Sequence, residues 1–153
     1  GMKLAEALLE RSECQERLHV LESRLQANLK IQEGDEPHED PQALLKEAME
    51  VQERLCTLIQ RINRTNQTLE LEKGVTLSDA LARRDMLRRK RQMLSNLAHS
   101  AQERDYRLTH SEVKMRLTLD LGAIQKEIDA LSKQFRELDT RIQGVNWTAE
   151  LLD

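Results

Sequence analysis

The amino-acid sequence predicts a mainly α-helical fold, a long antiparallel bundle of about four helices that occupies residues 1–153 as a single domain. Apolar residues recur at alternating steps of three and four, which is the spacing of one helix face. Charged residues make up 33% of the chain and there are only 5 glycines, a composition typical of long paired helices or coiled coils. Because aromatic residues are only 2%, aliphatic side chains must supply the core.

The first two predicted helices, at residues 4–32 and 41–71, are expected to form an antiparallel hairpin around an acidic loop at residues 33–40. Asp40 followed by Pro41 marks the start of the second helix, because Asp caps free N–H groups and Pro at the first helical position loses no hydrogen bond. The leucines and valine expected to seal this hairpin are Leu18, Leu21, Leu25, Val51, Leu55 and Leu58.

The third and fourth helices are predicted at residues 77–101 and 121–143. Thr76 and Asp79 match a capping box at the start of the third helix, with the cap residue followed three positions later by a carboxylate. Asp120 is positioned to cap the fourth helix. Arginines interrupt the apolar stripe of the third helix, whereas the stripe of the fourth is uninterrupted.

One segment departs from the helical period. Apolar and polar residues alternate strictly over Val113–Leu121, which predicts a strand with one buried face. A lone strand cannot satisfy its own backbone groups. We therefore expect a short strand or hairpin near residues 105–121, with Asp105–Thr109 folded back on it or with the same segment of another subunit as its partner. A helix is the alternative for this segment.

Several short motifs are similar to those of a known family. They are Glu33-Gly34-Asp35-Glu36-Pro37, Glu39-Asp40-Pro41, Ile62-Asn63-Arg64-Thr65-Asn66, Thr76-Leu77-Ser78-Asp79-Ala80-Leu81-Ala82 with Arg84-Asp85, and Asn146-Trp147. With these motifs the chain resembles the septicolysin-like family of small, uncharacterised bacterial proteins over nearly its whole length. By its name alone, the resemblance implies a pore-forming cytolysin. It brings no catalytic residues with it.

The sequence contains no motif that indicates catalysis, so we expect no enzyme, no cofactor and no metal. Its histidines are scattered and form no pair at metal-binding spacing. The alternative is a metal bound by His38 and the surrounding carboxylates of the acidic loop. Cys14 and Cys56 lie on or beside apolar stripes and are expected to be reduced and buried.

Polar residues on the apolar stripes and near the helix ends are the best candidates for a polar or anion-binding site. Arginines on such stripes must extend toward water, form an internal ion pair or bind an anion, because a buried unpaired charge is very costly. Asparagines on them most often fix register and oligomeric state. The candidate residues are Arg11, Asn28, Asn63, Asn66, Arg84, Asp85, Arg91, Asn146 and Trp147.

These observations together predict a cytoplasmic, non-enzymatic structural or interaction protein that acts as a homo-oligomer, a dimer or higher. The net charge is −3 and no apolar run approaches the length of a membrane span, so we expect neither nucleic acid nor membrane as a partner. There are two alternatives to the interaction protein. One is the pore-forming cytolysin, and the other is nucleic-acid binding through the basic run 83–91, although no aromatic residue interleaves with this run for base stacking.

Overall fold

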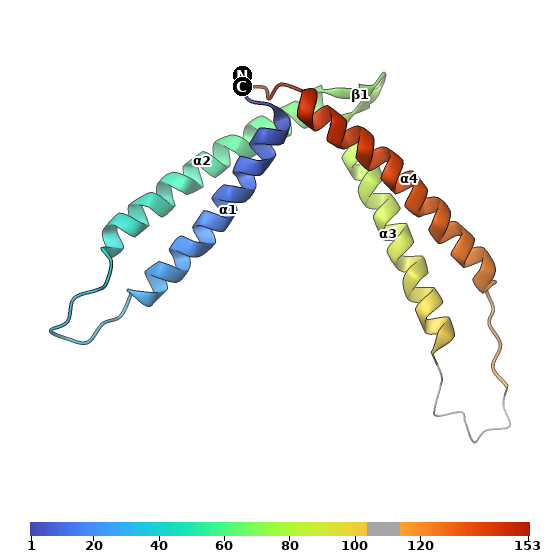
Figure 1. The fold of residues 1–153 in the computed structure, drawn as a ribbon, viewed down its shortest axis with the longest axis horizontal. Helices are drawn as coiled ribbons and strands as arrows, with labels where there is room; N and C mark the ends of the chain where they lie inside the picture. The colour runs from blue at the N-terminus through green and yellow to red at the C-terminus, as the bar shows by residue number, and fades with distance from the viewer. Residues whose placement is uncertain (104–113) are drawn as a thin grey trace. The chain divides into compact units, whose positions relative to one another are not determined.

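The computed structural model describes residues 1–103 and 114–153, which form four helices and one two-stranded β-hairpin (Figure 1). The elements, in chain order, are α1 Leu4–Ala27, α2 Pro41–Thr68, β1 Glu70–Glu72, β2 Val75–Thr76, α3 Leu77–Gln102 and α4 Leu121–Thr148. The predicted mainly α fold with four helices and one short hairpin is confirmed. The chain divides into two compact units: unit 1 comprises Gly1–Glu70 and Gln143–Asp153, and unit 2 comprises Leu71–Ile142.

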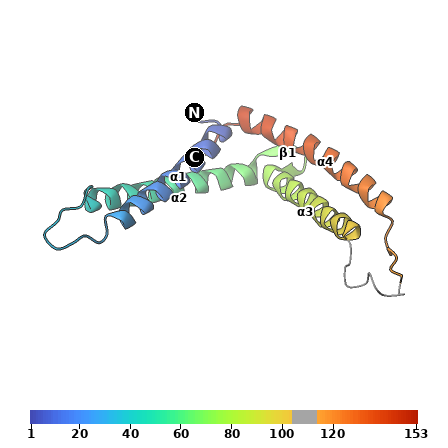
Figure 2. The ribbon, with the colours of Figure 1, turned by 60° about the horizontal axis from the view of Figure 1, so that its bottom comes forward.

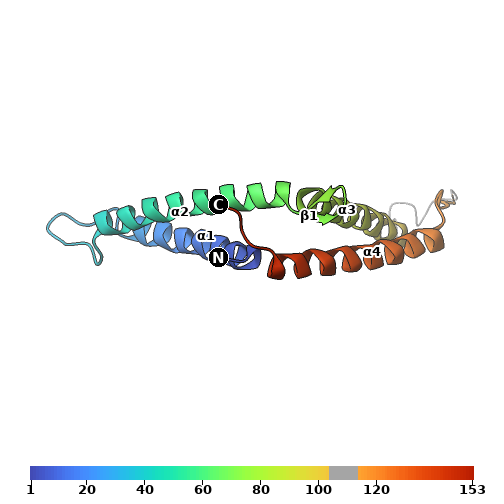
Figure 3. The ribbon, with the colours of Figure 1, turned by 90° about the horizontal axis from the view of Figure 1, so that it is seen from above.

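In unit 1, α1 and α2 form the expected antiparallel hairpin and run side by side (Figure 3). Its core contains Leu21, Leu44 and Ala48, with Leu18, Leu25 and Val51 packed against them. Leu58 is fully buried further along α2. Bidentate ion pairs join the exposed edges of the two helices. Arg17 donates to both carboxylate oxygens of Glu47, at 2.9 and 2.7 Å, and Arg54 donates to those of Glu10, at 2.8 and 3.0 Å.

Helix α1 ends at Ala27, earlier than the predicted residue 32. The reason is Asn28, whose side-chain carboxamide makes hydrogen bonds at the helix end that take the place of those of a further turn. Its Nδ2 donates to the Arg24 carbonyl at 2.9 Å, while its Oδ1 accepts from the Glu39 main-chain N–H at 3.2 Å. Glu39 also forms an ion pair with Arg24. Asn28 therefore joins the two ends of the acidic loop at the mouth of the hairpin.

The end of the chain packs into unit 1 beside the start of α1. The Leu4 N–H donates to the Ala149 carbonyl and the Leu151 N–H donates to the Met2 carbonyl, both at 2.9 Å. Leu4 and Leu151 are buried. Helix α4 continues through Gly144 to Thr148, five residues beyond its predicted end at residue 143. A glycine inside a helix costs up to about 1 kcal/mol, which burial of the adjoining segment can offset.

In unit 2, α3 and the first part of α4 run side by side (Figure 2). Leu77, Ala80, Leu87 and Leu131 are buried. The β-hairpin precedes α3, and its turn contains Gly74 at φ +82°, a conformation that other residues rarely adopt. The predicted caps are confirmed. The Thr76 hydroxyl accepts from the Asp79 N–H at 3.1 Å, and in the same way the Asp120 carboxylate accepts from the N–H of Gly122 at 2.9 Å.

The predicted strand near residues 105–121 is wrong for the residues that the structure describes. Residues 114–120 have no regular secondary structure and Leu121 begins α4, while Asp105–Thr109 and Val113 lie outside the described residues. The alternating leucines do not face a core, because Leu117 and Leu119 are 56% and 59% exposed. The hairpin among the described residues lies instead at 70–76, where Gly74 permits a tight turn.

Candidate functional site

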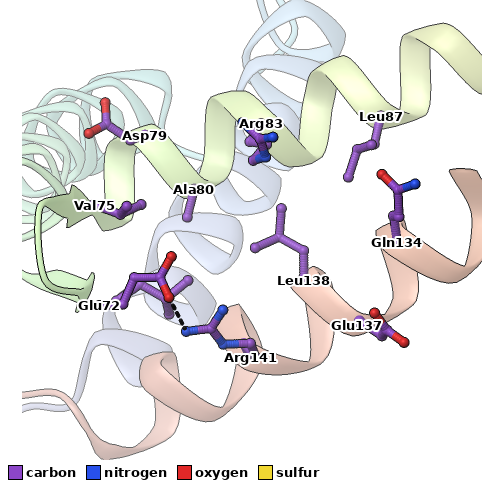
Figure 4. A pocket seen from close by; sticks show the side chains of 11 residues that line it. Glu72, Val75, Asp79, Ala80, Arg83, Leu87, Gln134, Glu137, Leu138 and Arg141 are labelled. Carbon is purple, nitrogen blue, oxygen red and sulfur yellow. Dashed lines mark hydrogen bonds and ion pairs between the residues drawn. The ribbon is translucent and has the colours of Figure 1, made fainter.

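A groove of about 550 Å³ lies in unit 2 between the β-hairpin, α3 and α4 (Figure 4). Its floor is apolar, because the small and branched side chains of the hairpin and the two helices meet there. Its rim carries charged groups of both signs. The lining residues are Leu71, Glu72, Val75, Asp79, Ala80, Arg83, Leu87, Gln134, Glu137, Leu138 and Arg141.

The charges on this rim are partly engaged with one another. Arg141 on α4 reaches across to Glu72 of β1, with Nη2 3.3 Å from Oε2, as the dashed line in Figure 4 shows. Asp79 is engaged in the cap of α3. Arg83 has no ion-pair partner among the described residues of unit 2. Because both carboxylates and guanidiniums line the groove, it offers no field of a single sign to a ligand.

A second, smaller pocket of about 250 Å³ lies in unit 1, between α1 and the end of α4. We call it the Arg11 pocket. Asn146 is almost entirely buried, at 7% exposure, whereas Trp147 beside it is 58% exposed. Arg11 is half-buried. The lining residues are Ala5, Leu8, Leu9, Arg11, Ser12, Gln143, Asn146 and Trp147.

The structure brings together three of the predicted site residues, Arg11, Asn146 and Trp147, which share this pocket although Arg11 is more than 130 residues from the other two along the chain. Two other candidates on α2 lie elsewhere in unit 1: Asn63 is exposed and Asn66 is half-buried.

Asn28 and the unit 2 candidates make separate contacts. Asn28 anchors the acidic loop, as described above. Arg84 is paired with Asp139 at 2.6 Å and Asp85 with Arg89 at 2.9 Å. The guanidinium carbon of Arg91 lies 5.6 Å from the centre of the Phe135 ring. Each of these polar residues has a structural partner.

The basic run on α3 is distributed around the helix. Arg84 and Arg89 form ion pairs with Asp139 and Asp85, while Arg88 and Arg91 both lie over the ring of Phe135, the former at 5.3 Å. A ring with negative faces attracts such cations. Much of the positive charge in this run is therefore engaged inside unit 2.

Sequence reasoning missed the groove in unit 2. Glu72 and Arg141 are 69 residues apart, and neither lies in a motif. Arg83 was visible only as a member of the basic run. The one local signal was Lys73-Gly74, which interrupts the helical pattern where the β-hairpin forms.

The two cysteines differ in their surroundings. Cys14 is half-buried, and burial, with Glu10 as a smaller cause, raises the pKa of its thiol. Cys56 is exposed, so the prediction that both thiols are buried is wrong for Cys56 in the single chain. The reason is that Cys56 lies outside the stripe of α2 that is buried, which includes Ala48, Leu58 and Ile62. Across residues 1–103 and 114–153, no three His, Cys, Asp or Glu side chains are placed to hold a metal ion.

Within the described part of the chain, no helix has an apolar stretch long enough to cross a membrane.

A family model described as a family of unknown function, DUF6847, matches residues 11–151. A crystal structure described as that of a functionally unknown conserved protein from Corynebacterium diphtheriae is 44% identical to this chain. The similarity covers 98% of each chain with a TM-score of 0.91. No curated protein matches the chain.

These comparisons correct the resemblance inferred from the short motifs. The family model spans most of the chain and is not septicolysin-like, and the similar crystal structure has no such description. The motifs lie largely at helix caps, loops and turns, where local structure favours the same residues in unrelated helical proteins. The cytolysin hypothesis rested on that family name and is withdrawn. The chain belongs to the family of unknown function DUF6847.

Proposed function

We propose that this chain is a non-enzymatic interaction protein that works as a homo-oligomer, with one face of α2 as the contact between copies. We call this face the outer stripe. Its residues follow alternating steps of four and three along the helix, and its large apolar members, Leu45, Met49 and Ile59, are 42%, 57% and 37% exposed. The outer stripe comprises Leu45, Met49, Gln52, Cys56, Ile59 and Asn63.

The width of the apolar surface on α2 supports this proposal. The inner residues Leu44, Ala48 and Leu58 are buried in unit 1. The outer stripe lies directly beside them, so α2 is apolar over two adjacent faces, which suits burial against more than one neighbour. Single exposed apolar residues are ordinary, but three large ones on the same face of one helix favour an interaction surface. Because Leu45, Met49 and Ile59 are only about half exposed in the single chain, burying the rest of each contributes about half of the roughly 1.5–3 kcal/mol that full burial gives.

A second copy of the chain is the partner that fits this stripe best. Closed two-fold dimers are the commonest assemblies of soluble proteins, and they place the same surface patch on both subunits. Gln52 and Asn63 interrupt the stripe with side chains that hydrogen-bond across an interface and fix its register. The free thiols of Cys14 and Cys56 fit a reducing compartment such as the cytoplasm.

The test is the molecular mass of the wild type and two variants, measured by light scattering over a dilution series. Ile59→Glu places a charge in the middle of the outer stripe, whereas Thr57→Glu adds the same charge at an exposed position away from it. We expect the wild type and Thr57→Glu to have the mass of an oligomer and Ile59→Glu to have the mass of one chain. A wild type of monomeric mass at micromolar concentration would sink the proposal.

A further inference from the structure

We propose that the Arg11 pocket of unit 1 binds a small organic anion, with a carboxylate or phosphate group held by Arg11 and Asn146 and an apolar body against Leu8, Leu9 and Trp147. This inference does not depend on the self-association proposed above. It rests on the charge of the pocket, on one buried amide and on an aromatic wall.

The first observation is an unpaired positive charge. Arg11 is the only charged residue that lines the pocket. Unit 1 lies wholly within the described residues, and within it every other arginine bonds to a carboxylate or to the end of the chain. The nearby carboxylates of α1 are already engaged, since Glu6 accepts from the Lys3 N–H and Glu10 pairs with Arg54. Arg11 is therefore left to meet a negative group from outside the chain.

The second observation is the carboxamide of Asn146. The residue is 7% exposed, yet its side chain has no hydrogen-bond partner among the residues of unit 1. None of the described side-chain polar atoms is both sealed from solvent and unpartnered, so the amide must still reach open space. The space that it lines is the Arg11 pocket. The N–H group of this amide is therefore free to donate to an anionic oxygen that enters the pocket.

The remaining wall sets the kind of anion. Leu8, Leu9 and Trp147 form an apolar side, and the Trp147 indole is exposed enough to stack on a ligand. A volume of about 250 Å³ fits a molecule of the size of one substituted ring or a short aliphatic chain. The unit 2 groove is larger but carries both signs of charge, so it lacks this preference.

Trp147 is the only tryptophan of the chain, so its fluorescence reports directly on the pocket. The probes are phenyl phosphate and benzoate, with benzyl alcohol as a neutral molecule of similar size. We expect a saturable fluorescence change with at least one of the two anions, and the one that saturates at lower concentration identifies the preferred headgroup. Benzyl alcohol should bind roughly tenfold more weakly or worse, because it lacks the charged hydrogen bonds.

Arg11→Gln should weaken binding of the anion by about tenfold or more, and Arg11→Lys should fall between it and the wild type, because lysine keeps the charge but loses the planar fork. Arg17→Gln is the matched control, since it removes the same charge from α1 outside the pocket. The proposal is overturned if neither anion gives a saturable change, or if Arg11→Gln binds as the wild type does. It is also overturned if the apparent Kd rises with protein concentration, because the occupant would then be a second copy of the chain.

Discussion

The two helical hairpins of this chain share arginine–carboxylate pairs, but only the hairpin of unit 2 adds contacts between arginines and an aromatic ring. In unit 1, arginines of α1 and α2 bind carboxylates on the facing segment, as in Arg17–Glu47 and Arg54–Glu10. In unit 2, Arg84 of α3 also binds a carboxylate, that of Asp139 on α4. Arg88 and Arg91 of α3, however, lie over the ring of Phe135 on α4. Both solutions let arginine stems cover apolar surface while the charged end finds a partner.

The comparison shows how a chain with few aromatic residues uses the ones it has. Phe135 is the only phenylalanine, and two guanidiniums share it. The α1–α2 hairpin has no phenylalanine, so its arginines rely on carboxylates alone, and these contacts depend on pH and salt. Unit 1 should therefore respond to acid through these ion pairs, whereas the contacts to Phe135 contain no group that titrates in the acid range.

The largest effect expected from a single substitution is in the apolar cores, where the two units should behave alike. Leu58 in unit 1 and Leu87 in unit 2 are 0% and 4% exposed. Replacing either with alanine should lower the free energy of unfolding by about 2–5 kcal/mol. Chemical denaturation measures the loss, and amide hydrogen exchange locates it, in α1 and α2 for Leu58→Ala and in α3 for Leu87→Ala. A Leu58→Ala protein with an unchanged melting midpoint would remove Leu58 from the core of unit 1.

A smaller effect is expected at Phe135, and it isolates the chemistry particular to unit 2. Phe135→Leu keeps an apolar side chain but removes the ring, so it should lose the attraction to Arg88 and Arg91, about 0.5–1 kcal/mol for each exposed contact. Phe135→Ala should cost more, because burial is lost as well. Thermal melts of the two variants measure both terms. If Phe135→Leu melted at the wild-type temperature, the two arginines would gain nothing from the ring.

The smallest effect concerns acid and unit 1. Hydrogen bonds from Arg54, Arg24 and Lys3 hold the pKa values of Glu10, Glu39 and Glu150, respectively, below the ordinary value of a glutamate. A carboxylate with a lowered pKa in the folded state stabilises the fold above its unfolded pKa, and this stability is lost as the pH falls through the folded value. Unit 1 should therefore lose stability as the pH falls below about 4.5.

Thermal melts across this acid range measure the loss. Glu10→Gln should be less stable than the wild type near neutral pH and should lose less on acidification, because glutamine does not titrate. Glu53→Gln, an exposed glutamate of α2 without an ion pair among the described residues, is the control and should follow the wild-type profile. Parallel pH profiles for the wild type and Glu10→Gln would show that the Glu10–Arg54 pair does not contribute to this dependence.

Much of the fold could be predicted because it depends on local rules. The helix starts at Pro41, Leu77 and Leu121 follow from caps at Asp40, Thr76 and Asp120, which are visible as residue types at fixed positions. The α1–α2 hairpin follows from the apolar period. The end of α1 did not follow, because Asn28 stops it by contacting Glu39, a partner 11 residues away.

The alternation near Val113–Leu121 misled for a related reason. Alternation of apolar and polar residues predicts a strand only if a second strand pairs with it. The sequence of the segment alone does not show whether such a partner exists. The candidate pocket was predictable in part, because a polar residue on an apolar stripe, such as Arg11, needs a partner. That Asn146 would meet it depends on the end of the chain packing beside α1, which no local pattern encodes.

The most direct test of self-association through the outer stripe uses Cys56, which lies in that stripe and is exposed in the single chain. The measurement is the rate at which Cys56 reacts with a thiol reagent as the protein concentration is raised, with half-buried Cys14 as the internal reference. If copies associate through the outer stripe, Cys56 should react more slowly as the concentration rises, while the rate of Cys14 stays constant. A fast reaction of Cys56, equal to that of an unfolded thiol at every concentration, would contradict the account.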